Sequence, residues 1–266
     1  GQGALMAVGG YCMALLMINQ SYSLWVAIPL AIVGSALAGL LLGIAAARLT
    51  GPYLAGTTLV IALAIPTLAN RFMSVLKGDE GLPVDVGYPP VWFTNLFGEP
   101  SYEQWQLYVA LPFAAIALFL ASNILLSRTG RMWRAIRDNE TAAALSGVNF
   151  SRQKIFVFVV SATFAGLSGA LYGLRGLVGP SVYPVSLSLL LLTAAVLGGI
   201  RSIFGAFIGT VIVVFLPDWI DAVLHQFELS EQVSNFMPAL VSSLLLILTV
   251  VINPAGVAGT HLHKHK

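Results

Sequence analysis

Long stretches without a charged side chain constrain the fold of this 266-residue chain more than any other feature. Asp, Glu, Lys and Arg are absent from residues 1–47, 49–70, 104–127, 155–174, 176–200, 202–217 and 232–263. Most of these runs are long enough to cross a bilayer, which takes about 20 apolar residues. Because 58% of the chain is hydrophobic, more than the core of a soluble domain requires, we predict an integral membrane protein.

The type of spanning structure follows from backbone chemistry. In hydrocarbon every backbone amide needs an internal hydrogen-bond partner, so spanning segments are helices or a closed barrel. The apolar runs are continuous and do not alternate with polar residues, which excludes the barrel. We predict an all-α, polytopic transmembrane bundle of about eight spans, within a range of about seven to nine. The expected spans are 2–18, 23–47, 54–73, 105–127, 154–175, 185–199, 203–217 and 236–252.

Two features refine this bundle. The sixth and seventh spans are short and are separated by "GGIRS", which predicts short or broken helices near 185–217. The chain also begins inside an apolar segment without an initiator Met or a basic flank, so we expect an N-terminally incomplete sequence. The single cysteine, Cys12, excludes intrachain disulfides.

The distribution of basic residues predicts the orientation in the membrane. Ten of the 13 Lys and Arg residues share one side if Arg48, the 128–154 loop, Arg201 and the C-terminal tail lie together, and the positive-inside rule makes that side cytoplasmic. The external loops, 74–104 and 218–235, then hold nine of the 11 acidic residues. Aromatic residues in "WFTNLFGEPSYEQW" predict an interfacial belt with a short amphipathic helix, for membrane anchoring or for contact with a partner.

Small residues in three expected spans predict close helix packing. Glycines four residues apart let two helix backbones approach to van der Waals contact. Three such pairs occur: Gly39 and Gly43, Gly169 and Gly173, and Gly205 and Gly209. We interpret them as contacts within the subunit or its complex, with dimerisation as the alternative.

Polar residues around Pro66 distinguish the expected span 54–73. A proline inside a helix frees backbone carbonyls that a substrate or a water can use. The neighbouring polar side chains are Thr57, Thr58, Thr67 and Asn70. They predict a lining for a transport pathway, with a packed kink as the alternative.

The chain has no recognisable catalytic motif. G-x-x-x-x-G-K-[ST], H-E-x-x-H, C-x-x-C and G-x-S-x-G are all absent. No Asp, Glu, Lys or His lies near the centre of an expected span, which argues against an ion-coupled carrier. Three of the four histidines lie in the terminal "HLHKHK", which we interpret as a solvated tail. We expect no enzyme activity, no metal, no cofactor and no nucleic-acid partner. We expect the chain to transport a substrate, with the energy for active transport supplied by another chain.

The most charged stretch, "GRMWRAIRDNETAAALSGV" at 130–148, lies in the longest expected cytoplasmic connection. Helical periodicity places Arg131, Arg134 and Arg137 on one face, and Met132, Ile136 and Ala143 on another. Asp138 or Asn139 can cap a second short helix that has Glu140 in its first turn and Gly147 as its stop. The pattern predicts a compact amphipathic element that lies on anionic lipid or docks on another protein.

Several segments resemble the branched-chain amino acid ABC transporter permeases, a family that includes urea and amide permeases. Residues 130–173 are similar to the corresponding region of the family, and Glu140 to Gly147, "ETAAALSG", resembles its coupling loop. In 48–64 the similar positions are Arg48, Gly51, Tyr53, Ala55 and Leu59. In 197–213 the family pattern Leu-Gly-Gly-x-x-Ser-x-x-Gly is matched by Leu197, Gly198, Gly199, Ser202 and Gly205. The opening "GQGALMAVGGY" departs from the family because it lacks the usual His and Phe.

The resemblance implies a single permease domain, 1–266, in the cytoplasmic (inner) membrane of a bacterium or archaeon. The implied partners are a homologous second permease, two cytoplasmic ATP-binding subunits and an external solute-binding protein, with ATP bound by the partner subunits. The loop 128–153 is expected to couple to the ATPase through Arg131, Arg134, Arg137, Glu140 and Gly147. The implied substrates are branched-chain or other hydrophobic amino acids, with urea or short amides as the alternative. An ion-coupled secondary transporter and a purely structural membrane subunit are the remaining alternatives.

Overall fold

A computed structural model describes residues 1–49, 52–85, 87–199, 202–224, 243–244 and 247 of the chain. The chain divides into two compact units, residues 1–185 and residues 186–266. Helices dominate both units in the part of the chain that the structure describes. The prediction of an all-α fold is therefore confirmed.

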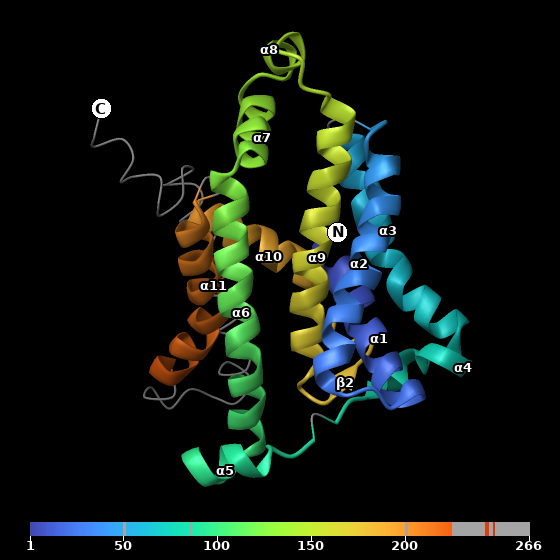
Figure 1. Cartoon of the computed structure of the whole chain (residues 1–266), viewed down its shortest axis with the longest axis vertical. Coiled ribbons are helices and arrows are strands. Elements are labelled where there is room, and N and C mark those ends of the chain that lie inside the picture. The colour runs from blue at the N-terminus through green and yellow to red at the C-terminus, as the bar shows by residue number, and fades with distance from the viewer. Residues whose placement is uncertain (50–51, 86, 200–201, 225–242, 245–246, 248–266) are drawn as a thin grey trace. The chain divides into compact units, whose positions relative to one another are not determined.

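Long helices form the frame of the first unit (Figure 1). Each lies within a few residues of an expected span, because charged or turn-forming residues bound the apolar runs. The three that pack together most extensively are α1, α2 and α9. The long helices are α1 (Gln2–Gln20), α2 (Leu24–Ala46), α3 (Pro52–Arg71), α6 (Tyr102–Leu126) and α9 (Phe150–Gly173).

Short elements connect these helices. They are α4 (Met73–Leu76), the 3-10 helix η1 (Gly78–Glu80), β1 (Leu82–Pro83), α5 (Val91–Phe97), α7 (Arg128–Asp138), α8 (Glu140–Leu145) and β2 (Leu177–Val178). The chain bends by 88° between α3 and the segment that begins at α4. β1 and β2 pair antiparallel, with Leu82 opposite Val178, and so join two connections that are far apart in sequence.

Glycines bring α2 and α9 into close contact. A Cβ atom on Gly39 would collide with the Cβ of Ala162. One on Gly43 would lie 3.0 Å from the Cβ of Phe158 and 3.1 Å from the carbonyl oxygen of Ile155. Larger residues at these two positions would therefore push the helices apart.

The contact between α1 and α9 is equally tight. A Cβ atom on Gly169 would collide with the carbonyl group of Met6, so the two backbones touch there. One turn further along α9, a Cβ on Gly173 would lie 2.6 Å from Cγ2 of Val178. The small residues of α9 thus fix α1 and β2 against one helix.

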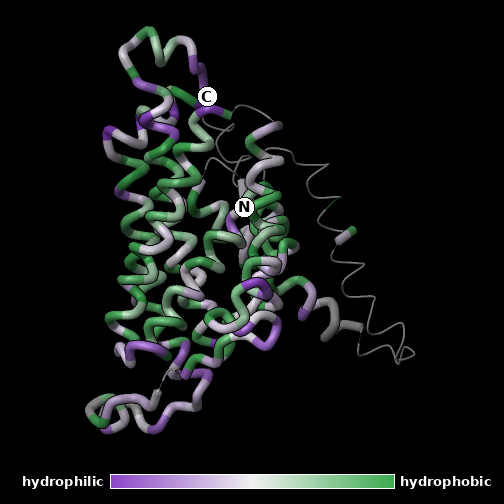
Figure 2. Tube along the Cα trace, turned by 90° about the vertical axis from the view of Figure 1, so that its right-hand side faces the viewer, coloured by the Kyte–Doolittle hydropathy of each residue, from purple (hydrophilic) through white to green (hydrophobic). Residues whose placement is uncertain are grey.

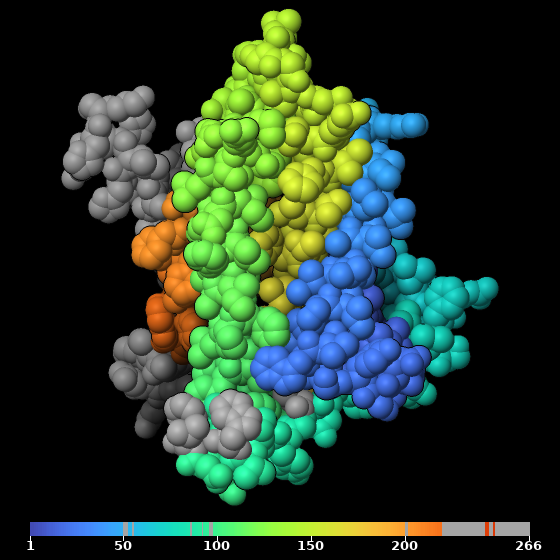
Figure 3. Space-filling view, in the orientation of Figure 1, coloured from blue at the N-terminus to red at the C-terminus, as the bar shows by residue number. Residues whose placement is uncertain are grey.

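Much of the apolar surface of the first unit faces outward. Four helices, α1, α2, α6 and α9, are long and apolar enough to span a membrane, and the bent α3–α4 pair makes a fifth candidate. In α6 only 6% of the most apolar stretch is buried, and this helix lies open along one face (Figure 3). Exposed leucines and phenylalanines of this kind are stable in hydrocarbon and costly in water.

Charged residues of the first unit gather at its two ends (Figure 2). The basic end carries α7, α8 and the beginning of α9 (Figure 1). Lys154 of α9 donates to the carbonyl of Leu49, the residue after Arg48, so Arg48 lies near the same end. The opposite, acidic end carries α4, η1 and α5, with Asp79, Glu80 and Glu99 in or next to these elements. The aromatic belt predicted there includes α5, where Phe93 packs against Trp105 at 5.2 Å between ring centroids. The expected loop 74–104 therefore has local structure.

The second unit contains α10 (Val185–Gly198) and α11 (Ile203–Leu224). The two helices touch through backbone, since a Cβ on Gly209 would collide with the carbonyl oxygen of Ala194, and one on Gly198 with that of Gly205. α10 is short, as expected, but α11 continues through Pro217 into the segment expected to begin the external loop 218–235. The rest of that loop, Arg201, the C-terminal tail and all of the expected span 236–252 except residues 243, 244 and 247 lie outside the described residues.

Candidate functional site

The connection between α6 and α9 consists of two capped helices. The Ser127 hydroxyl oxygen accepts a hydrogen bond from the N–H of Gly130 at 3.4 Å and begins α7. The side-chain oxygen of Asn139 accepts from the N–H of Ala142 at 3.0 Å and begins α8. Asn139, and not Asp138, is therefore the cap of the second helix. Such caps each contribute on the order of 1 kcal/mol to helix stability.

Gly147 ends α8 in a left-handed conformation, with φ of 84°. Its N–H bonds to the carbonyl of Ala144 at 3.0 Å, and the next N–H, of Val148, bonds to the carbonyl of Ala143 at 3.1 Å. This is the turn in which a glycine satisfies the last carbonyls of a helix without strain.

The three arginines of α7 make different contacts. Arg131 donates to the carbonyl of Leu126, and Arg134 to the carbonyl of Leu125, each at 3.3 Å. Both therefore bind the last turn of α6, where unpaired carbonyls and the helix dipole favour a positive charge. Arg137 instead forms an exposed ion pair with Asp138 at 3.1 Å.

Trp133 attaches α7 to α9. Its indole N–H donates to Oε1 of Gln153 at 3.1 Å, and its ring lies 5.9 Å from that of Phe156. A neutral hydrogen bond of this kind contributes about 1 kcal/mol, and the ring contact adds about as much. Trp133 was not among the predicted site residues. The signal was a tryptophan in an amphipathic helix, next to Met132 on the face away from the arginines.

α8 stands at the tip of the basic end (Figure 1). Within α8, the side chain of Ala143 is buried, whereas Leu145 is 86% exposed. Glu140 is exposed at the first position of the helix. α8 is thus a short helix fixed by its caps that carries an exposed apolar side chain at its end.

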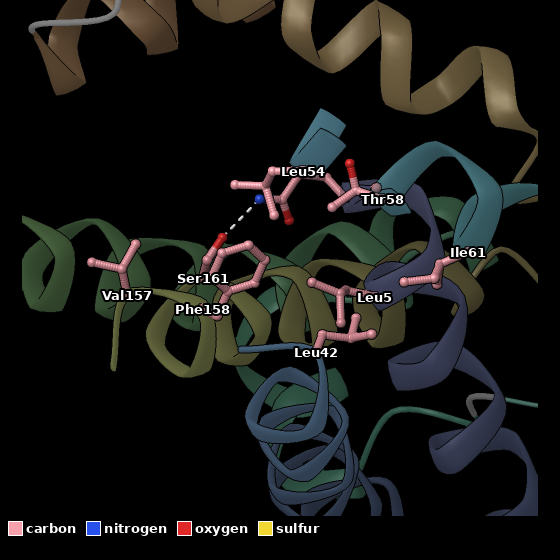
Figure 4. Close-up of a pocket in the computed structure, with 10 residues that line it drawn as sticks. Leu5, Leu42, Leu54, Thr58, Ile61, Val157, Phe158 and Ser161 are labelled. Atoms are coloured by element: carbon pink, nitrogen blue, oxygen red, sulfur yellow. Dashed lines mark hydrogen bonds between the residues drawn. The ribbon is translucent and has the colours of Figure 1, made fainter. Parts of the chain in front are cut away.

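A cavity of about 290 Å³ lies between α1, α2, α3 and α9 (Figure 4). Most of its wall is apolar, and its polar groups are the neutral side chains of Gln2, Thr58 and Ser161. The amide of Gln2 donates to the Ser161 hydroxyl at 2.7 Å across this space. We call it the central cavity. Its size and lining suit a small, largely apolar ligand.

The residues predicted to line a pathway are dispersed by the structure. Thr58 lines the central cavity, whereas the Thr57 hydroxyl donates to the carbonyl of Tyr53 within its own helix, at 2.8 Å. Thr67 is exposed on α3. Asn70 lies further along the helix, where its amide donates to Asp79 at 3.3 Å. Gln2 and Ser161 were not among the predicted pathway residues, because single polar side chains in apolar helices carry no recognisable pattern.

The described residues contain no group of three or more His, Cys, Asp or Glu side chains that could hold a metal ion. Nor does the central cavity carry a charged side chain that could bind a phosphate or an ionised cofactor. Neutral, mostly apolar groups therefore form the wall of the central cavity.

Residues 1–252 match the family model described as the permease component of the branched-chain amino acid transport system. The chain belongs to this family. The permease is a multi-pass membrane protein, and the resemblance inferred from its sequence is confirmed.

Curated relatives agree with the family match. The permease is 33% identical over 234 residues to the high-affinity branched-chain amino acid transport system permease protein LivM of Salmonella typhimurium, an alignment that covers 80% of the permease. It is 29% identical over 206 residues to LivH of Escherichia coli, a permease protein of the same description, covering 76% of the permease and 63% of LivH. The L-arabinose transport system permease protein AraH of Escherichia coli is 27% identical over 145 residues, covering 53% of the permease and 42% of AraH.

The permease spans about half the length of LivM, 55% of it, in this alignment. No solved structure matches the permease.

Proposed function

We propose that the permease is the membrane-spanning subunit of an ABC importer for branched-chain or other hydrophobic amino acids. It acts in the cytoplasmic membrane of a bacterium or archaeon, with a homologous permease, two ATP-binding subunits and an external solute-binding protein. The family match supports the transport role. Similarity to two distinct permease proteins, LivM and LivH, supports a pair of permeases.

The observation that carries the coupling role is the rigid α7–α8 element at the basic end. α8 is fixed by Asn139 and ended by Gly147, and it presents Leu145 outward. Arg131 and Arg134 hold α7 to α6, which leaves Arg137, Glu140 and the exposed face of α8 for contact with an ATPase subunit. Closure of the ATPase dimer would then push α8, and Trp133 would transmit the push to α9.

The central cavity is our candidate for a point on the transport pathway. α1, α2 and α9 form three of its walls and α3 forms the fourth, so motion of the three packed helices relative to α3 would change its shape. Its neutral polar groups suit the passage of an apolar side chain without tight binding. Selection of the substrate is then left largely to the external solute-binding protein.

The energy source distinguishes this function from its alternatives. In proteoliposomes that contain the complete complex, uptake of radiolabelled leucine should require ATP and persist after ionophores collapse the ion gradients. Uptake that stops when ionophores collapse the ion gradients, and that does not require ATP, would instead establish a secondary transporter. Uptake of urea or acetamide in place of leucine would move the substrate to the alternative class, and no uptake of any of them would favour a structural subunit.

Replacing Leu145 by Asp should uncouple the complex. A carboxylate on the exposed tip of α8 cannot enter an apolar groove without a desolvation cost of several kcal/mol, so we expect co-purification of the ATPase and leucine uptake to fall by about tenfold or more. Tyr88→Asp is the matched control, since Tyr88 is 96% exposed at the acidic end. Normal ATPase binding and uptake in Leu145→Asp would refute the docking role of α8.

A further inference from the structure

A second cavity, of about 520 Å³, opens at the basic end between α7, α8, α9 and the beginning of α3. We call it the basic-end cavity. Apolar and aromatic side chains form most of its wall, and one acidic and one basic side chain face the same space. The lining residues that matter here are Trp133, Ile136, Glu140, Phe150, Lys154 and Val157.

The two charged residues of this cavity retain capacity to bind a ligand. Glu140 has no hydrogen bond or ion pair with any residue in the described part of the chain. The ammonium of Lys154 donates to the carbonyl of Leu49 and lies 5.3 Å from the ring centroid of Phe150, which leaves two of its three protons available. The two charges do not pair with each other, so each is free to take a charge of opposite sign.

The combination defines the chemistry of a ligand. An ammonium group suits Glu140, a carboxylate suits Lys154, and a hydrophobic side chain suits the wall formed by Trp133, Ile136, Phe150 and Val157. A purely anionic or purely cationic ligand would leave one charge unused, and a polar side chain would lose its hydration against the apolar wall. We propose that the basic-end cavity binds a free hydrophobic α-amino acid.

This site differs from the central cavity in its charge. The central cavity offers neutral Gln2, Thr58 and Ser161, whereas the basic-end cavity offers a complementary pair of charges. A ligand that joins Glu140 of α8 to Lys154 of α9 also restrains α8 relative to α9. This regulatory consequence rests on the proposed function, under which the amino acid accumulated in the cytoplasm would slow its own import. The binding itself does not depend on that function.

The test measures binding of three related probes to the full chain in lipid nanodiscs, without an external solute-binding protein. The probes are leucine, 4-methylpentanoate, which lacks the ammonium, and isopentylamine, which lacks the carboxylate. Equilibrium dialysis should show leucine bound about tenfold more tightly than either truncated probe. Glu140→Gln should weaken leucine about tenfold and leave 4-methylpentanoate unchanged. Lys154→Met should weaken leucine similarly and leave isopentylamine unchanged.

Two control variants locate the site. Arg152→Gln removes an exposed charge two residues from Lys154 that does not line the cavity, and it should bind leucine as the wild type does. Tyr88→Phe changes an exposed side chain at the acidic end that lines neither cavity, and it should also leave the dialysis result unchanged. Retained binding of the truncated probes shows that the variants are folded.

Wild-type affinity for leucine in both Glu140→Gln and Lys154→Met would overturn the proposal, and so would loss of leucine binding in Arg152→Gln or Tyr88→Phe. Because dialysis needs neither ATP nor transport, it can succeed where the uptake experiment fails. Conversely, ATP-driven leucine uptake with no leucine binding at this cavity would overturn this proposal alone.

Discussion

Tyr183 is the residue on which several buried contacts of the first unit converge. Its hydroxyl donates to the carbonyl of Gly169 at 2.7 Å, and a Cβ on Gly10 would collide with it. Burial, followed by the nearby Tyr11 and Tyr172, raises the pKa of this hydroxyl above its ordinary value. Like an ordinary tyrosine, Tyr183 is protonated throughout the physiological range, so its hydroxyl can donate the hydrogen bond to α9 there.

Replacing Tyr183 by Phe should destabilise the permease by about 1 to 3 kcal/mol, because the carbonyl of Gly169 loses its side-chain donor in a buried place. Thermal unfolding in detergent should show a lower Tm. Tyr22→Phe is the control, since Tyr22 is 45% exposed. Equal Tm values for the two variants would mean that the hydroxyl of Tyr183 adds nothing to stability.

Single residues also show which parts of the candidate site could be predicted from the sequence. Gly147 was predicted as a helix stop because left-handed turns select glycine, a purely local requirement. Trp133 was missed because its partner, Gln153, lies 20 residues away on another helix. The contact of Gln2 with Ser161 joins residues 159 apart in sequence, and no local pattern encodes such a pair.

Among the elements, α8 depends most on its ends. It is only six residues long, too short to be stable by itself, so its caps and its attachment through α7 must hold it. Asn139 supplies the first cap and Gly147 the last turn. The docking surface proposed above therefore exists only while both ends are intact.

Asn139→Ala should loosen α8 without unfolding the permease. Loss of the cap costs about 0.5 to 2 kcal/mol, which speeds hydrogen exchange of the amides in 140–145 by roughly two- to thirtyfold. Asn139→Ser keeps a capping oxygen and should restore slow exchange. Fast exchange in the serine variant, or slow exchange in the alanine variant, would contradict the capping role.

The long helices were predictable because each corresponds to an apolar run bounded by charged or turn-forming residues, as at Ser101, which caps α6. The 88° bend after α3 was not predictable. It arises at Phe72, whose φ of −106° and ψ of 47° leave the helical region without a proline or glycine to signal it. The pairing of β1 with β2 was also missed, since two residues per strand are too few for a periodic pattern.

For the first unit as a whole, charge separation defines a direction across the membrane. The basic end carries α7 and α8, and the acidic end carries η1 and the segment before α5. Because positive charge is retained on the cytoplasmic side of membrane proteins, we expect α7, α8 and the basic-end cavity to face the cytoplasm. We expect Tyr88 and the acidic end to face outward.

Cysteine labelling can test this orientation, because Cys12 is the chain's single cysteine and can be replaced by Ala. In that background, Tyr88→Cys should react with a membrane-impermeant maleimide in intact cells. Leu145→Cys should react only in inside-out vesicles. Both side chains are exposed, at 96% and 86%, so access to reagent is not limited by the fold. The opposite labelling pattern would reverse the topology and place the coupling element outside.

The glycine contacts of α9 also determine how the permease can move. Backbones that touch at Gly39 and Gly169 cannot slide past one another without collision, so α1, α2 and α9 are expected to turn as one block. If an ATPase subunit displaces α8, the resulting conformational change must then occur in a connection outside these three helices. The connection at Ser127, which lies between α6 and α7, is the nearest part of the coupling element that lies outside that block. The same small residues that hold α1, α2 and α9 together thereby make them move as a rigid body.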